Sequence, residues 1–317
     1  YEGTLHASFN VLVRTGRASS FNPNQHNPPR VGGYRECFRA RPGEVFCSLD
    51  YSAQEMSTLA QVCINLFGES GLADAINGGT DPHLLFALRL LETDGHAMSY
   101  AEALAALKNR NHPSHEKVKH WRKVAKVCNF GYPGGLGSNT FVEYAQGYGL
   151  DIGPNESREY QKAFFAQWPQ VNRYLRQYIG GLSQNVERFT IRQHVSGRIR
   201  GGCTYTSAAN SFFQGLAADA TKLALYQVVK AQYTDLLSPL FGTRTWNVIH
   251  DELLLRGPEE TAHEWAWEAS RLMVEAHKRY TPDVKCGAEP AIMYVWDKDA
   301  DRVDNPAGRL VSWIPKA

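Results

Sequence analysis

Two aspartates at the ends of apolar segments have the chemistry to bind a divalent metal. Asp50 follows the segment VFCSL, and Asp251 lies within VIHDELLL. Each aspartate alone is typical of a strand that meets solvent. If both strands belong to one antiparallel sheet, the carboxylates can hold the same ions, and two Mg²⁺ ions about 3.5–4 Å apart are the usual arrangement for in-line phosphoryl displacement. The sequence therefore predicts a two-Mg²⁺ site, which Mn²⁺ can also occupy. His250, beside Asp251, fits a packing role at least as well as a functional one.

A second group of residues has the spacing of one helix face. Arg122, Lys126 and Phe130 are four residues apart in RKVAKVCNFG, so they drift only slowly around a helix. Two cations and an aromatic ring on one stripe can hold a triphosphate and stack against its sugar and base. The alternative is a basic amphipathic helix on the surface, which the spacing alone favours.

Charge and loop composition point to a polyanionic partner. Net charge is only +2, but residues 108–126 hold seven Lys/Arg and one acid, and residues 185–205 hold four arginines. From residue 245 onward the balance reverses, with nine basic and thirteen acidic residues. The segment TGRASSFNPNQHN, around Arg17, has the small, hydroxyl and amide side chains that suit contacts to phosphates and minor-groove acceptors. Any one of these tracts could equally be a solvated face or a plain loop, but together they favour a phosphate-facing cleft.

The elements that must position these residues follow from apolar spacing and from glycine and proline breaks. The pattern predicts a loop over residues 1–43 and a strand at 44–50. Helices are predicted at 55–67, 82–92, 99–110, 115–130, 156–182 (broken near Pro169), 207–235 and 258–280. Residues 245–256 are predicted to form a strand, a tight turn with His250 and Asp251 at the bend, and a second strand, and a last strand is predicted near 284–296. Strands at both ends of the sequence with helices between them indicate a mixed α+β fold.

Composition excludes several classes of protein. The chain has 317 residues, of which 43% are hydrophobic, and no apolar run reaches the roughly 18 residues of a membrane span. The cysteines show no C-x-x-C pairing, which argues against a zinc ribbon or finger and favours reduced thiols in a cytoplasmic protein. The sequence begins at Tyr1, so we expect the native start to be missing.

Five segments in this order closely resemble the family A DNA polymerases, the group of bacterial polymerase I and many bacteriophage enzymes. SLDYSAQE is similar to motif A of that family, RKVAKVCNFGY to motif B and VIHDE to motif C. TGRASSFNPN and NSFFQGLAADATKLAL resemble two further stretches that contact DNA. The resemblance runs from about residue 4 to the C-terminal strand, and five motifs in family order are highly specific.

The resemblance assigns roles to individual residues. It implies a metal site formed by Asp50, Asp251 and the main-chain carbonyl of Tyr51, with Glu252 as a catalytic acid next to the primer end. The residues that it implies for the incoming deoxynucleoside triphosphate are Arg122, Lys126, Phe130, His83 and Glu55, with Tyr132 as a substitute for a tyrosine that the family places at position 134. The residues that it implies for primer-template DNA are Arg17, Asn27, Asn210, Gln214 and His250.

The implied fold is a right hand with an antiparallel palm sheet and helical fingers. We expect the palm in residues 1–68 and 206–317, with the fingers in residues 69–205. We expect the thumb to be largely absent from this chain, with a missing segment or a separate chain supplying it. Two positions depart from the family pattern: Gly134 replaces the motif B tyrosine, and Thr206 replaces an arginine.

The implied function is template-directed DNA synthesis, in which two metal ions promote addition of a deoxynucleotide to a primer 3′ end and pyrophosphate leaves. One alternative is a single-subunit RNA polymerase, which lacks an acid five residues after the motif A aspartate, where this chain has Glu55. Another is a catalytically inactive DNA-binding relative, which could dispense with Asp50 or Asp251. We expect no membrane partner and a cytoplasmic enzyme, in the host cytoplasm if a bacteriophage encodes it.

Overall fold

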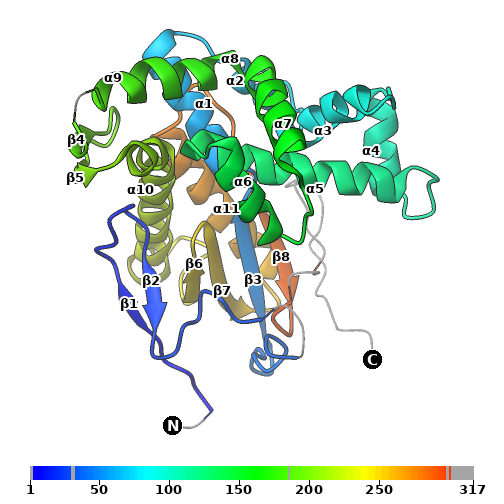
Figure 1. Ribbon diagram of the computed structural model, residues 1–317. Helices are drawn as coiled ribbons and strands as arrows, with labels where there is room; N and C mark the ends of the chain where they lie inside the picture. Colours follow the sequence, from blue (N-terminus) through cyan, green and yellow to red (C-terminus); the bar gives the residue numbers. More distant parts are fainter. Residues whose placement is uncertain (1–2, 30–32, 185, 298–299, 301–317) are drawn as a thin grey trace. The chain divides into compact units, whose positions relative to one another are not determined.

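The computed structural model describes residues 3–29, 33–184, 186–297 and 300, and it divides the chain into two compact units (Figure 1). The first, here the sheet unit, combines Tyr1–Gln54, Gln214–Pro282 and Cys286–Ala317. The second, here the helical unit, comprises Glu55–Phe213 and Asp283–Lys285. The divisions fall at residues 54 and 213, whereas the sequence led us to expect them at 68 and 205.

The sheet unit is built on four antiparallel strands in the order β6-β7-β3-β8. Their bounds are β3 Glu44–Tyr51, β6 Arg244–Ile249, β7 Glu252–Pro258 and β8 Ala288–Met293. The predicted strand at 44–50, the hairpin at 245–256 and the last strand are thus confirmed. Residues 1–43 differ from the predicted loop, because β1 (Ser8–Asn10) and β2 (Ser19–Phe21) pair across the TGRASS turn.

Alternation along β3 gives the sheet two distinct faces. Val45, Cys47 and Leu49 are fully buried in a core that includes α11 (Ala262–Lys278) and the later part of α10 (Tyr205–Thr234). The residues between them face the opposite side, where Phe46 lies within 4.8 Å of the Trp246 ring. Because Asp50 shares the parity of Phe46 and Ser48, it lies on the side away from α11.

The helical unit contains the predicted helices between residues 55 and 182, the start of the one predicted at 207–235, and several short elements that periodicity did not reveal. Its elements are α1 Gln54–Phe67, α2 Gly71–Asn77, α3 Pro82–Thr93, α4 Tyr100–Lys108, α5 His115–Gly131, the 3₁₀ turn η1 Tyr132–Gly134, α6 Ser138–Gln146, α7 Pro154–Gln167, α8 Pro169–Arg173, the π-helix η2 Tyr174–Ile179, α9 Gly180–Leu182, β4 Phe189–Arg192, β5 Ile199–Cys203 and the start of α10. The break at Pro169 is confirmed, since α7 ends at Gln167.

Helices α3, α4 and α5 share a small core formed by Leu84, Ala103, Ala106 and Val118. Because Leu84 is in the first turn of α3 and Val118 is in α5, this packing fixes the first turn of α3 against α5. Among the described residues, no helix combines the length and the apolarity that a membrane crossing needs.

Candidate active site

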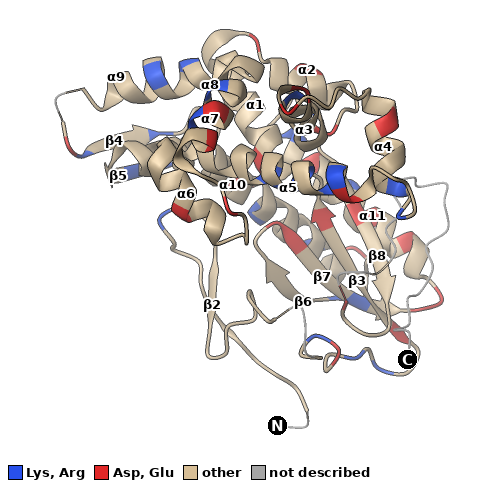
Figure 2. Cartoon of the chain, turned by 45° about the vertical axis from the view of Figure 1, so that its right-hand side comes forward, with Lys and Arg blue, Asp and Glu red and all other residues tan. Residues whose placement is uncertain are grey.

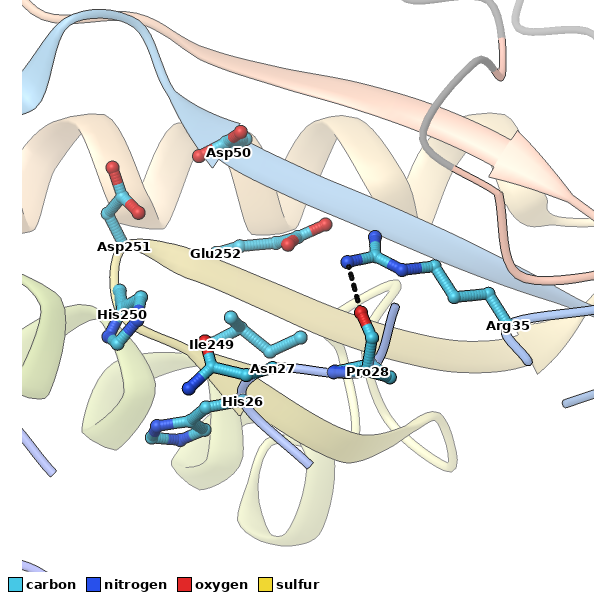
Figure 3. Close-up of a pocket in the computed structure, with 9 residues that line it drawn as sticks. All are labelled: His26, Asn27, Pro28, Arg35, Asp50, Ile249, His250, Asp251 and Glu252. Carbon is cyan, nitrogen blue, oxygen red and sulfur yellow. Dashed lines mark hydrogen bonds between the residues drawn. The ribbon is translucent and has the colours of Figure 1, made fainter. Parts of the chain in front are cut away.

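Strand pairing brings the predicted acids of the sheet unit together. Asp50 lies directly opposite Glu252 in the register of β3 and β7, and Asp251 precedes Glu252 in the turn that joins β6 to β7 (Figure 3). Figure 2 shows acidic positions at the adjoining ends of β3 and β7. Residues directly opposite on one face have Cβ atoms about 4.5–5.5 Å apart. The sheet therefore positions two of the acids by register and the third by the turn.

Glu252 is held by a residue that sequence reasoning missed. Its side chain is buried, with only 2% of the residue exposed, and its Oε1 accepts a hydrogen bond from the Ser48 hydroxyl. Ser48 is two residues before Asp50 on the same face of β3, so its hydroxyl points toward the same group of acids. The alternation of β3 could have indicated Ser48, because a hydroxyl among buried apolar residues needs a partner.

A pocket of about 370 Å³ opens over these acids in the sheet unit. Its lining comes from the β3 and β7 ends and from the loop after β2, and it consists of His26, Asn27, Pro28, Arg35, Asp50, Ile249, His250, Asp251 and Glu252 (Figure 3). Arg35 Nη2 donates to the Pro28 carbonyl at 3.3 Å, which ties the loop together. The pocket thus joins the predicted acids to Asn27, a predicted DNA contact.

His250 occupies a backbone position that tight hairpin turns require. Its φ is 56°, in the left-handed region that is uncommon for residues other than glycine. Its ring contacts the His26 ring at 5.1 Å, edge to face. The pKa of His250 is lowered to about 4, mainly by burial and also by the charges of Arg17 and His26, while Glu252 opposes the shift. At neutral pH His250 is therefore uncharged, and Arg17 lies close enough to influence it.

The donor set fits Mg²⁺ or Mn²⁺ by its chemistry. Within the described ranges, no three His, Cys, Asp or Glu side chains form a ready metal cage. Mg²⁺ is usually bound through one or two carboxylates plus water and substrate phosphates, so an incomplete set of oxygen ligands is what it needs. Asp50 and Asp251 supply such carboxylates, and nitrogen or sulfur ligands are not required.

The segment after Asp50 is held by α11, by β8 and by the residue just before β8. The Tyr51 hydroxyl donates to the Met273 carbonyl at 2.6 Å, and burial raises the pKa of this tyrosine. Ser52 donates from its amide to the Gly287 carbonyl at 2.9 Å and from its hydroxyl to Glu289 Oε1 at 2.9 Å. These contacts hold the backbone of Tyr51, whose carbonyl is the predicted metal ligand.

In the helical unit, α5 carries the predicted triphosphate-binding residues. Lys126 is exposed, and its Nζ lies 5.8 Å from the centre of the Phe130 ring. Arg122 donates from Nε to Asp81 Oδ2 at 2.8 Å. Asp81 is the N-cap of α3, and its other oxygen accepts from the His83 amide at 2.8 Å. The structure therefore brings Arg122, Lys126 and Phe130 together with α3, and it adds Asp81, which sequence reasoning missed.

His83 belongs to the same cluster. Its ring lies 5.6 Å from Phe130, and its Nδ1 is 2.8 Å from the amide nitrogen of Asn129. The pKa of His83 is lowered to about 4, mainly by burial; Asp81 opposes the shift, and the positive charges of Arg122 and Lys126 contribute to it. His83 is therefore neutral at physiological pH.

One predicted nucleotide contact is corrected by the structure. Tyr132 is fully buried, its ring stacks on Phe141 at 4.3 Å, and its hydroxyl donates to the Ser157 carbonyl at 2.9 Å. Tyr132 keeps helical backbone angles and lies four residues after the buried Cys128, so its side chain continues the buried face of α5. Tyr132 is therefore a packing residue, and Glu55, in the first turn of α1, remains half-exposed.

The space at Gly134 is taken by Asn210. A Cβ atom at Gly134 would lie 2.7 Å from both terminal atoms of the Asn210 side chain. Asn210 donates from Nδ2 to the Gly134 and Thr206 carbonyls, at 3.2 and 2.9 Å. A predicted DNA contact is therefore partly engaged within the helical unit. Gln214, a half-buried residue of α10, belongs by the division of the chain to the sheet unit.

Comparison with known proteins gives a consistent result. The family model for DNA polymerase family A matches residues 1–298. The chain is 31% identical over 270 residues to DNA polymerase I of Chloroflexus aurantiacus, covering 81% of this chain and 25% of the relative. It is 31% identical over 279 residues to the DNA polymerase of Mycobacterium phage D29, covering 86% of this chain and 39% of the relative.

A solved structure shares the fold. The polymerase domain of Pol1 from M. smegmatis, solved as a complex with DNA primer-template and dNTP, superposes with a TM-score of 0.70 and 25% identity. The match covers 92% of this chain and 48% of that one, so this chain spans between a quarter and a half of these three proteins. The right-hand polymerase fold expected from the motifs is thereby confirmed, and the chain belongs to DNA polymerase family A.

Proposed function

We propose that this chain catalyses template-directed DNA synthesis, adding deoxynucleotides to a primer 3′ end with release of pyrophosphate. The observation that carries the proposal is the register pair of Asp50 and Glu252, which lines one pocket together with Asp251. Carboxylates gathered on a rigid sheet around a polar pocket suit phosphoryl transfer, because that reaction depends on positioning and charge stabilisation. Membership of DNA polymerase family A supports the same reaction.

Asp50, Asp251 and the Tyr51 carbonyl would hold two divalent metal ions, Mg²⁺ or Mn²⁺. When bound, these ions would activate the attacking primer hydroxyl and stabilise the charge on the leaving pyrophosphate. The protein contributes the geometry: strand register fixes Asp50, Ser48 fixes Glu252 next to the primer end, and β8 fixes the backbone at Tyr51.

The helical unit would bind the incoming triphosphate. Arg122 and Lys126 supply positive charge, and Arg122 keeps its two terminal nitrogens for phosphate because Asp81 is bound through Nε. His83 supplies a neutral hydrogen-bonding ring, and Phe130 supplies a surface for the sugar and base. Glu55 would exclude a ribose 2′-hydroxyl.

Primer-template DNA would be bound by polar residues of both units. Arg17, Asn27 and His250 lie at or near the pocket of the sheet unit. Asn210 and Gln214 lie on α10. Of the described basic tracts, α5 and the β4–β5 hairpin carry clusters of Lys and Arg (Figure 2) that can contact the phosphate backbone.

Primer extension on defined templates tests the proposal. We expect extension that follows the template sequence and requires Mg²⁺ or Mn²⁺. Asp50→Asn and Asp251→Asn preserve side-chain shape but remove charge, so nucleotide addition should fall by orders of magnitude while primer-template affinity, measured by fluorescence anisotropy, is largely kept. Glu260→Gln changes an exposed acid of the sheet unit and serves as the control. Substantial extension by Asp251→Asn would refute the assignment.

A second experiment separates nucleotide binding from DNA binding. If Lys126 holds the triphosphate, Lys126→Ala should raise the nucleotide KM strongly and change duplex affinity little. Lys123→Ala is the matched control, because Lys123 is an exposed lysine on the same helix. Normal nucleotide kinetics with lost DNA affinity would instead show that α5 is a basic surface for DNA.

A further inference from the structure

The side chain of Asn129 lies against the first turn of α3. Only 2% of Asn129 is exposed, and it immediately precedes Phe130 on α5. Its Nδ2 is 2.8 Å from His83 Nδ1 and 3.4 Å from the Pro82 carbonyl oxygen. One amide group therefore contacts two adjacent residues of α3.

These two contacts determine which way the hydrogen bond to His83 runs. The Pro82 carbonyl can only accept, so the amide group that faces it must be the NH₂ and not the oxygen of Asn129. The reverse orientation would place two acceptors 3.4 Å apart with no proton between them. Because an NH₂ group donates and does not accept, His83 Nδ1 must accept with its lone pair. A neutral imidazole then carries its single proton on Nε2.

The position of that proton matters for a triphosphate. Phosphate oxygens only accept hydrogen bonds, so an Nε2–H group attracts them, whereas an unprotonated Nε2 would present a lone pair to a negative charge. The charged groups that face His83 are Asp81, Arg122 and Lys126. The two cations already favour an anion at this place, and the tautomer decides whether the ring assists them.

We propose that Asn129 is a positioning residue that fixes His83 as its Nε2–H tautomer, so that His83 donates a hydrogen bond to the triphosphate of the incoming nucleotide. The inference rests on the proposed phosphate contact of His83 and adds the residue that makes this contact favourable. A further observation supports it: Asn129 Oδ1 is buried, and no residue in the described part of the chain donates a hydrogen bond to it. A leucine of similar size would avoid that cost, so the amide is explained by the hydrogen bonds that it donates.

Nitrogen-15 NMR of the histidine rings tests the tautomer in the unmodified chain. Long-range proton–nitrogen spectra at neutral pH distinguish protonated from unprotonated ring nitrogens, and the His83→Gln variant identifies the signals of His83. We expect an unprotonated Nδ1 and a protonated Nε2. The opposite pattern overturns the inference, and this measurement does not depend on the folding of any Asn129 variant.

Kinetics of primer extension test the consequence. Asn129→Leu keeps the volume and removes the donor, so the nucleotide KM should rise about tenfold with little change in kcat. In the His83→Gln background the same change should add almost nothing, because the two residues act through one contact. Cys128→Ala, at the neighbouring buried position of α5, controls for loss of packing. An equal effect of Asn129→Leu in both backgrounds would show a purely structural role and overturn the inference.

The outcomes also separate this inference from the proposed function. A normal nucleotide KM in His83→Gln overturns the phosphate contact of His83, and the inference with it, while primer extension by the chain is still observed. Failure of the unmodified chain to extend any primer, together with the expected NMR pattern, instead counts against the proposed function.

Discussion

The guanidinium Nε of Arg122 lies 2.8 Å from Oδ2 of Asp81, and the same carboxylate caps α3 through its other oxygen. The Asp81 carboxylate therefore caps the N-terminus of α3 and also binds Nε of Arg122 on α5. The contact is geometrically specific, because Arg122 donates to Asp81 through Nε and not through a terminal nitrogen.

This relationship makes Asp81→Asn informative. Asparagine can still cap α3 but has no charge to orient Arg122, so we expect the nucleotide KM to rise about three- to tenfold. Stability should change little, since both partners are partly exposed, at 37% and 27%. Steady-state extension and thermal unfolding measure the two effects, with the exposed Asp74→Asn as control. An unchanged KM would show that the ion pair has no part in nucleotide binding.

Ser48→Ala should separate the placement of Glu252 from the stability of the sheet. Removing the hydroxyl leaves Glu252 without the donor that orients it, so we expect kcat to fall about tenfold while primer-template affinity is kept. Cys47→Ala is the matched control, since Cys47 is the adjacent buried residue on the opposite face of β3. It should lower the free energy of unfolding without a comparable loss of kcat. Equal kcat values for the two variants would contradict the role of Ser48.

Glu55→Ala tests the selection of the sugar. A carboxylate arm over the edge of the bound sugar would reject a ribose 2′-hydroxyl, so its removal should increase ribonucleotide use relative to deoxyribonucleotide use by more than about tenfold, or roughly 1.4 kcal/mol. If Glu55 only interacts with the dipole of α1, the loss is about 0.3–1 kcal/mol of stability with no change in the sugar ratio. Competition between the two nucleotides in primer extension distinguishes these results.

Gly134→Ala should displace the side chain of Asn210. The new Cβ would lie 2.7 Å from the terminal atoms of the Asn210 side chain. Asn210 can rotate to avoid this clash, but it then loses its hydrogen bond to the Gly134 carbonyl. We expect the free energy of unfolding to fall by about 1 kcal/mol and DNA affinity to change. Gly137→Ala is the control, because no atom lies within 4 Å of a Cβ there. Unaltered DNA affinity would argue against a DNA contact by Asn210.

The stability of the sheet unit should depend on pH through His277. Burial lowers the pKa of this residue from 6.5 to about 4, and its Nδ1 lies 2.7 Å from the Thr281 hydroxyl. As the pH falls between these values, the unfolded chain binds a proton that the folded chain does not. The free energy of unfolding should therefore decrease by at most about 1.4 kcal/mol per pH unit for such a histidine. His277→Gln should reduce this slope in chemical denaturation, whereas the exposed His120→Gln should not.

Sequence patterns predicted the parts of the fold that are determined by residues close together in the chain. The β6–β7 hairpin followed from two apolar runs around His250 and Asp251, and the end of the helix at Gly131 followed from Pro133. The partners of the orienting residues could not be found in this way. Ser48 and Glu252 are 204 residues apart, and Asp81 and Arg122 are 41 apart, so only the folded chain shows that they meet.

Tyr132 shows why the rest could not be predicted. Its position two residues after Phe130 made it a candidate for the nucleotide, but its backbone is still helical and it lies one turn after the buried Cys128, so its ring belongs to the buried face of α5. The burial of the ring against Phe141 depends on α6, a short helix whose existence periodicity did not indicate.

The two aspartates that we propose as metal ligands differ in how easily their backbone can move. Asp50 belongs to β3, which has hydrogen-bonded neighbours on both sides, so it shifts only if the sheet deforms. Asp251 belongs to a two-residue turn whose first member, His250, already has a left-handed backbone. In the proposed metal site, Asp50 would thus be the fixed ligand and Asp251 the adjustable one. Tolerance for ions of different radius would therefore be set by the composition of the turn, at position 250, and not by the sheet.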